Sequence, residues 1–250
     1  MLSFGETLAL SAVIGFSVYL SLPIFLRRDT NEIATRLLNA VAIGILIFLM
    51  GDVFSDVSTL LYNHSLYGYG SSFFPDLAFF VSFAVGFLML YYAENRSRIS
   101  ALTATQLALI IALAMGFQNL TEGLVFGSLG VSFGLSGAAL VVLIGFFLQN
   151  LTEGFPIVSP FLGRTEGKLA VMLGLFFIGG IPTIIGGAVG YFYNGTILDV
   201  AFDGLAIGTI LYAILPMLRS LLREVDPVKQ RICYFGIFLG FIIGFLVNLI

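Results

Sequence analysis

The sequence predicts an all-α polytopic membrane protein, a single domain with eight transmembrane helices. The first observation behind this prediction is composition: 59% of the 250 residues are hydrophobic and 10% are charged. A soluble domain could not cover so much apolar surface with polar side chains. The second observation is length, because the chain contains eight apolar segments of the roughly 20 residues that cross about 30 Å of hydrocarbon.

The eight predicted helices follow one another with short connections over residues 1–250. They cover Phe4–Leu26, Leu37–Tyr62, Pro75–Ala93, Ala101–Gly127, Leu135–Pro160, Leu169–Tyr193, Ile197–Leu222 and Ile232–Ile250. The first segment has no basic region before it, and so we expect a retained helix and not a cleaved signal. A Gly/Ser-rich turn near Leu135 predicts that the fourth and fifth helices form a tight antiparallel hairpin.

The basic residues predict the topology, since all eleven Lys and Arg lie in or beside odd-numbered connections. These are Arg27, Arg28 and Arg36 in the first, Arg96 and Arg98 in the third, Arg164 and Lys168 in the fifth, and Arg219, Arg223, Lys229 and Arg231 in the seventh. The positive-inside rule places these connections in the cytoplasm. We therefore expect a multi-pass protein of the cell membrane with both termini extracytoplasmic.

One hexapeptide occurs twice in the predicted membrane helices. Gln118-Asn119-Leu120-Thr121-Glu122-Gly123 in the fourth helix is repeated letter for letter as Gln149-Asn150-Leu151-Thr152-Glu153-Gly154 in the fifth. A charged carboxylate at the centre of a membrane helix costs about 2.5–3.5 kcal/mol on insertion scales. Two such residues beside the same amides therefore indicate a functional site.

Helical spacing places the polar side chains of each copy on one face, since the Gln and Glu are four residues apart. Both copies are equally far from the predicted turn, and so the hairpin brings them together roughly 22 Å below it. Carboxylate and amide oxygens suit a divalent cation. The predicted ligands are Gln118, Asn119, Glu122, Gln149, Asn150 and Glu153. The alternative is a hydrogen-bond network that only holds helices together; it would not need to repeat letter for letter.

Further acidic residues lie in the outer halves of two predicted helices. Asp52 and Asp56 are four residues apart in the second helix, and Asp203 lies in the seventh. No Lys or Arg lies in a predicted membrane core to pair with them. We expect these acids to form an ion pathway that concentrates cations before the site. Hydration in an outer vestibule is the alternative interpretation.

The residue types that the chain lacks restrict its chemistry. His64 is the single histidine and Cys233 the single cysteine, so the predicted site holds neither imidazole nor thiolate. There is no Walker motif, and direct coupling to ATP is not predicted. We expect no enzymatic activity, no resident cofactor and no nucleic-acid partner. The expected partners are the lipid bilayer and a transported divalent ion (Zn, Mn or Fe). The spacing of Gly236, Gly240 and Gly244 predicts close packing within the subunit or in a homodimer.

The paired hexapeptides and the eight-helix topology resemble the ZIP family of metal transporters (Zrt-, Irt-like proteins). The resemblance covers most of the chain. The family motif on the fourth helix is His-Asn-x-Pro-Glu-Gly, and the GufA-like branch has Gln first. Residues 118–123 match that branch except at Thr121, and residues 149–154 resemble the fifth-helix partner with Thr152 for Pro. Other family-like positions are Gly51, Asp52, Phe202, Gly208, Leu211, Tyr212 and Pro216.

The resemblance implies metal ligands at the six polar hexapeptide residues and ion uptake toward the cytoplasm. The chain departs from the family pattern in two ways. Proline would kink both helices and free backbone carbonyls, whereas Thr121 and Thr152 can bond to the preceding turn and bend a helix less. The family often has Glu before the proline of the sixth helix, where this chain has Ile181 before Pro182. A second metal position that needs this Glu is therefore not expected.

The sequence thus predicts a divalent metal cation transporter with its site between helices four and five. Without His or Cys ligands, its selectivity should be broad or favour harder ions such as Mn²⁺ or Fe²⁺ over strict zinc selectivity. Two alternatives stay open. The first is a non-transporting ZIP homologue that acts as a metal sensor or partner protein. The second is an intramembrane enzyme with paired carboxylates as acid and base, for which the sequence offers no additional nucleophile.

Overall fold

The structure, a computed structural model, describes residues 1–27, 29–66, 73–96, 102–135, 137–164, 167–193, 195–223 and 226–249. Within these ranges the chain is helical, and eight helical segments are long and apolar enough to cross a membrane. The predicted fold class is therefore confirmed. Arg28 and Arg98, which were used to predict the topology, lie outside the described residues.

The first span is composite, and the other seven are each formed by one long helix. The first comprises α1 (Phe4–Phe16), the 3-10 turn η1 (Ser17–Ser21) and α2 (Leu22–Leu26). The others are α3 (Glu32–Leu66), α4 (Phe73–Arg96), α5 (Ala104–Phe133), α6 (Ala138–Val158) extended by η2 (Ser159–Phe161), α7 (Leu169–Phe192), α8 (Thr196–Leu222) and α9 (Pro227–Asn248). Helix α5 continues to Phe133 although its predicted span ended at Gly127, because a helix does not stop where its apolar run stops.

The predicted hairpin between the fourth and fifth spans is present. Helix α5 ends at Phe133 and α6 begins at Ala138, so the connection is short. Gly134 and Gly137 have φ angles of 67° and 56°. Side-chain-bearing residues avoid this left-handed region, whereas glycine enters it freely. The two glycines therefore allow the chain to reverse, and the reversal places the two hexapeptides against each other.

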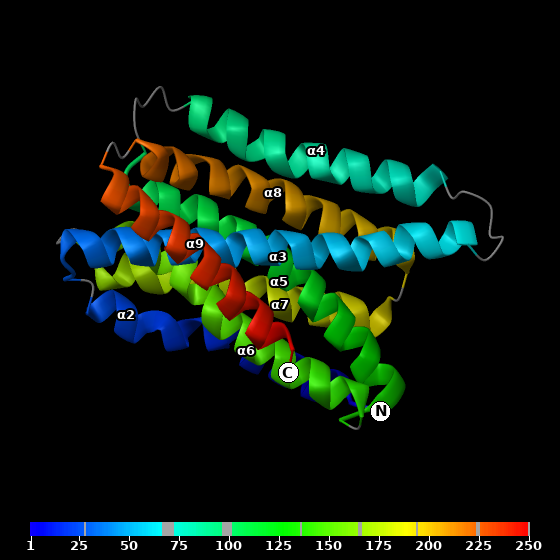
Figure 1. Ribbon diagram of the computed structural model, residues 1–250. Coiled ribbons are helices and arrows are strands. Elements are labelled where there is room, and N and C mark those ends of the chain that lie inside the picture. Colours follow the sequence, from blue (N-terminus) through cyan, green and yellow to red (C-terminus); the bar gives the residue numbers. More distant parts are fainter. Residues whose placement is uncertain are drawn as a thin grey trace.

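Glycines bring α9 close to α3, which it crosses obliquely in the view of Figure 1. A Cβ atom at Gly240 would collide with the Val41 carbonyl and would lie 3.0 Å from the Gly44 Cα. One turn away on either side, Gly236 and Gly244 face Ala40 and Phe48. The small-residue spacing in α9 thus serves packing within the subunit. A homodimer through another surface stays a prediction.

Helix α5 packs against both α7 and α8 and carries the first hexapeptide at its middle. On the α7 side the helices approach through glycines, since a Cβ at Gly123 would collide with the Thr183 carbonyl and one at Gly186 with the Leu120 carbonyl. The first hexapeptide is therefore fixed against the centre of α7.

Helix α4 lies at the edge of the bundle beside α8 (Figure 1).

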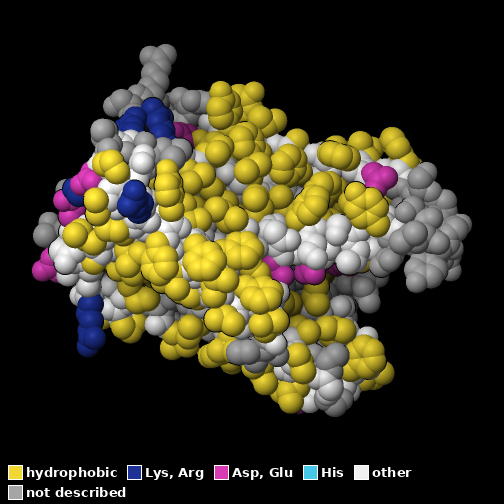
Figure 2. Space-filling view, viewed as in Figure 1, with side chains coloured by type: hydrophobic (Ala, Val, Ile, Leu, Met, Phe, Trp, Pro, Cys, Tyr) yellow, Lys and Arg dark blue, Asp and Glu magenta, His cyan; other side chains and the backbone are white. Residues whose placement is uncertain are grey.

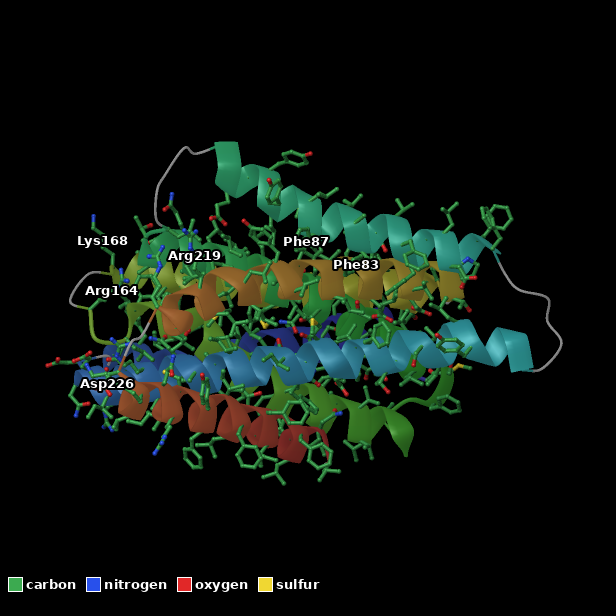
Figure 3. The ribbon with its side chains drawn as sticks, turned by 45° about the horizontal axis from the view of Figure 1, so that its top comes forward. Phe83, Phe87, Arg164, Lys168, Arg219 and Asp226 are labelled. Atoms are coloured by element: carbon green, nitrogen blue, oxygen red, sulfur yellow. The ribbon has the colours of Figure 1, made fainter. Side chains whose placement is uncertain are left out.

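The surface has the charge distribution of a membrane protein. On the visible face, hydrophobic side chains cover the middle and Lys and Arg gather at one end (Figure 2). Arg164, Lys168 and Arg219 all lie at that end of the helices (Figure 3). This clustering agrees with a positive side of the membrane, whose assignment to the cytoplasm stays a prediction.

Candidate functional site

The six polar hexapeptide residues meet inside the protein. None of them is more than 7% exposed, and Asn119, Asn150 and Glu153 are fully buried. One set of three projects from α5 and the other from α6, which the hairpin turn makes neighbours. The two copies therefore lie side by side, as the hairpin turn predicts.

Glu122 receives hydrogen bonds from both copies of the hexapeptide. The Asn150 side-chain amide on α6 donates to its Oε2 at 2.5 Å. The Gln118 amide, one turn earlier on α5, donates to its Oε1 at 3.4 Å. Both donors are NH₂ groups, so the carbonyl oxygens of the same amides are left for other partners.

Asn119 connects the site to α7. Its side-chain amide donates to the Gly179 carbonyl at 2.9 Å. Pro182 lies within α7, and a proline inside a helix lacks the N–H that would bond to the carbonyl four residues earlier. The carbonyl that loses its helical partner is that of Ile178, next to the Gly179 carbonyl that accepts from Asn119.

Glu153 is the least satisfied member of the site. Its side chain is fully buried, and neither carboxylate oxygen has a hydrogen-bond partner among the described residues. The Asn119 and Gln149 side chains lie beside it, and its charge interacts with that of Glu122. A buried carboxylate next to another carboxylate needs a cation or a proton to offset its charge.

Unsatisfied buried groups in the described part of the chain are all oxygens. Eight buried side-chain oxygen atoms there lack a hydrogen-bond partner, and no buried side-chain nitrogen does. Six of the eight belong to the hexapeptides: Gln118 Oε1, Asn119 Oδ1, Thr121 Oγ1, Asn150 Oδ1, Glu153 Oε1 and Glu153 Oε2. Leaving a buried acceptor unpaired costs about 1–3 kcal/mol. The site is thus a group of buried oxygens whose lone pairs are not used by hydrogen bonds within the described residues.

No group of three or more His, Cys, Asp or Glu residues that could hold a metal comes together in the described ranges. The carboxylates of the site number two, Glu122 and Glu153. An ion held here would need amide oxygens in addition, which agrees with the predicted ligand set. Oxygen ligands of this kind suit hard cations.

Neither comparison with known proteins gave a match. No protein-family model matches the chain, and no curated protein sequence does. The resemblance to the ZIP family stays a prediction that rests on the hexapeptides and the charge pattern.

The predicted ion-pathway acids lie near the site, each in a different setting. Asp52 accepts a hydrogen bond of 2.6 Å from Asn248 at the end of α9, and its charge interacts with those of Glu122 and Glu153. Asp203 on α8 is 3% exposed, and Asp56 lies near enough to repel it. Because Asp203 is buried, hydration in an open vestibule does not describe it.

The two threonines that replace the family prolines behave differently. The Thr152 hydroxyl donates to the Gln149 carbonyl at 2.7 Å, as expected for a threonine that bonds to the preceding turn. The Thr121 hydroxyl does not: it faces the Asp203 carboxyl group on α8 without completing a hydrogen bond. Helix α6 contains Pro156, four residues after Thr152. Its missing N–H leaves the Thr152 carbonyl without its usual helical partner.

Several residues around the site were not predicted. Ser11 on α1 and Thr183 on α7 are fully buried and supply the two remaining oxygens without a partner. In η1, Ser17 and Ser21 donate to the α6 carbonyls of Phe147 and Leu151 at 2.9 and 2.8 Å. The signal for them is the presence of small hydroxyl residues in otherwise apolar segments, which commonly marks helix contacts in membranes.

Proposed function

We propose that the protein is a transporter for divalent metal cations that moves them toward the cytoplasm through the site between α5 and α6. The observation that carries this proposal is the group of six hexapeptide oxygens without hydrogen-bond partners in the described structure. A hydrogen-bond network that only joined helices would have its acceptor oxygens bonded to donors. Here the amide nitrogens of Gln118, Asn119 and Asn150 donate to protein groups, while the oxygens of the same three amides have no partner among the described residues.

The burial of the site supports transport rather than surface binding. All six proposed ligands are at most 7% exposed. An ion bound there would be surrounded by protein at a depth where the bilayer is apolar. Intramembrane carboxylates without basic partners commonly mark ion pathways. Negative charge near the site comes from Asp52, Asp56 and Asp203. A cation could approach the site along these three side chains.

The ligand chemistry favours hard or intermediate ions. Carboxylates and amides bind Mn²⁺ and Fe²⁺ well, whereas a strictly zinc-selective site commonly has imidazole or thiolate ligands. We therefore expect Mn²⁺ or Fe²⁺ to be transported at least as well as Zn²⁺. A competition assay with the three ions measures this preference, and transport of Zn²⁺ alone would contradict it.

The decisive experiment measures Mn²⁺ flux into proteoliposomes. The double variant Glu122→Gln, Glu153→Gln keeps the size of both side chains and removes both charges. We expect its flux to fall to the level of empty liposomes, and its equilibrium Mn²⁺ binding to fall with it. A matched control is Asp76→Asn in the first turn of α4, outside the proposed ligand set. Its flux should equal that of the wild type.

The same experiment separates transport from the alternatives. Flux that survives the double substitution would overturn the assignment of the site. Tight Mn²⁺ binding without flux in the wild-type protein would instead favour the metal sensor. Normal flux of the control variant is needed to show that loss of a carboxylate is not itself harmful.

A further inference from the structure

A polar cavity lies at the basic end of the helices, separate from the hexapeptides. Its volume is about 490 Å³, which is in the range of small-molecule sites. Its walls come from the beginning of α3, the beginning of α5, η2 with the residues after it, and the end of α8. Apolar side chains also line it, among them Ile43, Leu107 and Met217.

The charged groups in the cavity wall are predominantly positive. Two arginines, Arg36 and Arg164, line it together with a single carboxylate, Glu32. Glu32 is already neutralised, because it accepts from the Arg36 guanidinium at 3.1 Å and from the Lys229 ammonium at 2.7 Å. Lys168 and Arg219 lie at the same end of the helices (Figure 3). A free cation would be repelled from this cavity, and an anion would be attracted.

The cavity also offers neutral polar groups. The Asn39 side chain lines it and has no hydrogen-bond partner among the described residues. The Thr30 and Thr35 hydroxyls share one hydrogen bond of 2.8 Å, in which either can be the donor. Together with the guanidinium groups, these side chains can supply several N–H and O–H donors to one ligand. Guanidinium forks match the oxygens of carboxylate and phosphate groups in particular.

We propose that this cavity binds a small oxyanion, a phosphate or carboxylate group, held by Arg36, Arg164 and Asn39. The oxyanion can come from a soluble molecule or from the headgroup of an anionic lipid, since the recognition chemistry is the same. The site does not depend on the proposed transport of metal ions. Ser159 in its wall follows Glu153 by six residues along α6 and η2.

The test measures binding of inorganic phosphate to the purified full-length protein by calorimetry at constant ionic strength. We expect saturable binding with one site per chain. Arg164→Gln and Asn39→Ala should each weaken it by about tenfold, as expected for loss of a hydrogen bond to a charged group. Thermal unfolding of each variant, followed by a thiol dye that reports exposure of the buried Cys233, shows whether it is folded.

Arg219→Gln is the matched control, because it removes one positive charge at the same end without changing the cavity wall. Its phosphate affinity should stay within about twofold of the wild type, as for other exposed charges. Equal weakening in Arg219→Gln and Arg164→Gln would show diffuse attraction and overturn the proposal. Absence of saturable phosphate binding in nanodiscs of phosphatidylcholine would also overturn it.

The source of the oxyanion is distinguished by repeating the titration in nanodiscs that contain phosphatidylglycerol. If a lipid headgroup fills the cavity, the phosphate binding that is seen in phosphatidylcholine nanodiscs should be lost in phosphatidylglycerol nanodiscs. In phosphatidylglycerol, Arg164→Gln should then cause no further loss of phosphate binding. If a soluble anion is the ligand, phosphate affinity should be the same in both lipids. Both outcomes support an oxyanion site. Metal flux is not measured, so failure of this test leaves the transport proposal unaffected.

Discussion

The Asn150 amide on α6 donates a hydrogen bond of 2.5 Å to the Glu122 carboxylate on α5. This bond joins the two copies of the hexapeptide, which are 31 positions apart along the chain, since Gln149 repeats Gln118. It also fixes the direction of the Asn150 side chain, whose carbonyl oxygen is buried and has no partner in the described structure. The same residue thus orients one carboxylate and presents a further oxygen to the site.

Replacing Asn150 should therefore weaken ion binding in two ways. Asn150→Ala removes the donor that orients Glu122 and one candidate ligand oxygen. We expect the affinity for Mn²⁺, measured by calorimetry on the purified protein, to fall by about tenfold or more. Gly145→Ala is the control on the same helix, because a Cβ at that position meets nothing within 4 Å. Unchanged affinity of Asn150→Ala would exclude Asn150 from the site.

The positions of the helices could be predicted from the sequence because hydrophobic length and charge spacing act locally. The predicted Leu169–Tyr193 span and α7 (Leu169–Phe192) differ by one residue. The pairing of the hexapeptides was predictable for a similar reason: Gly134 and Gly137 make a turn equidistant from both copies. Burial of the six polar residues followed from helical spacing and from that turn.

The contacts of the site with other helices could not be predicted, because they depend on how distant helices pack. Nothing in the local sequence shows that Asn119 donates to the Gly179 carbonyl of α7 or that Asn248 meets Asp52. The oxyanion cavity is assembled from four separate parts of the chain. A glycine stripe such as that of α9 predicts close packing but does not name the partner helix.

The predicted orientation in the membrane can be tested with single cysteines. In a Cys233→Ala background, Gly5→Cys lies at the predicted outer end and Lys168→Cys at the basic end, which is predicted to be cytoplasmic. A membrane-impermeant maleimide added to intact cells should label Gly5→Cys and should leave Lys168→Cys unlabelled until the cells are permeabilised. The reverse pattern would place the basic end outside, against the positive-inside rule.

Close packing of α9 on α3 predicts that Gly240 tolerates no larger side chain. A Cβ there would collide with the Val41 carbonyl, and backbone cannot move aside without separating the helices. We expect Gly240→Ala to destabilise the protein by about 1–3 kcal/mol, as overpacking does elsewhere. In Gly174→Ala the added Cβ meets nothing within 4 Å, and its melting temperature should match that of the wild type. Equal melting temperatures of the two variants would contradict the observed packing.

A polar contact joins α4 to α8 near the end of α4. The Tyr212 hydroxyl of α8 donates a hydrogen bond to the Glu94 carboxylate of α4, and the Tyr212 side chain is 6% exposed. In the described part of the chain, α8 is the main neighbour of α4, and Phe83 and Phe87 lie between the two helices (Figure 3). Apolar packing holds the middle of α4, so the hydrogen bond should matter most for its last turns.

Tyr212→Phe keeps the ring that packs on Phe87 and removes only the hydroxyl. Hydrogen bonds to a charged group contribute about 1.5–3 kcal/mol, and loss of this bond leaves the Glu94 carboxylate without the Tyr212 donor. We expect faster hydrogen exchange in the last two turns of α4 and an unchanged rate in α5. Tyr92→Phe is the control, since Tyr92 lies on α4 itself and is 65% exposed. If both variants exchange at the wild-type rate, the Tyr212 hydroxyl does not hold α4 to α8, and the apolar contacts between the helices are sufficient.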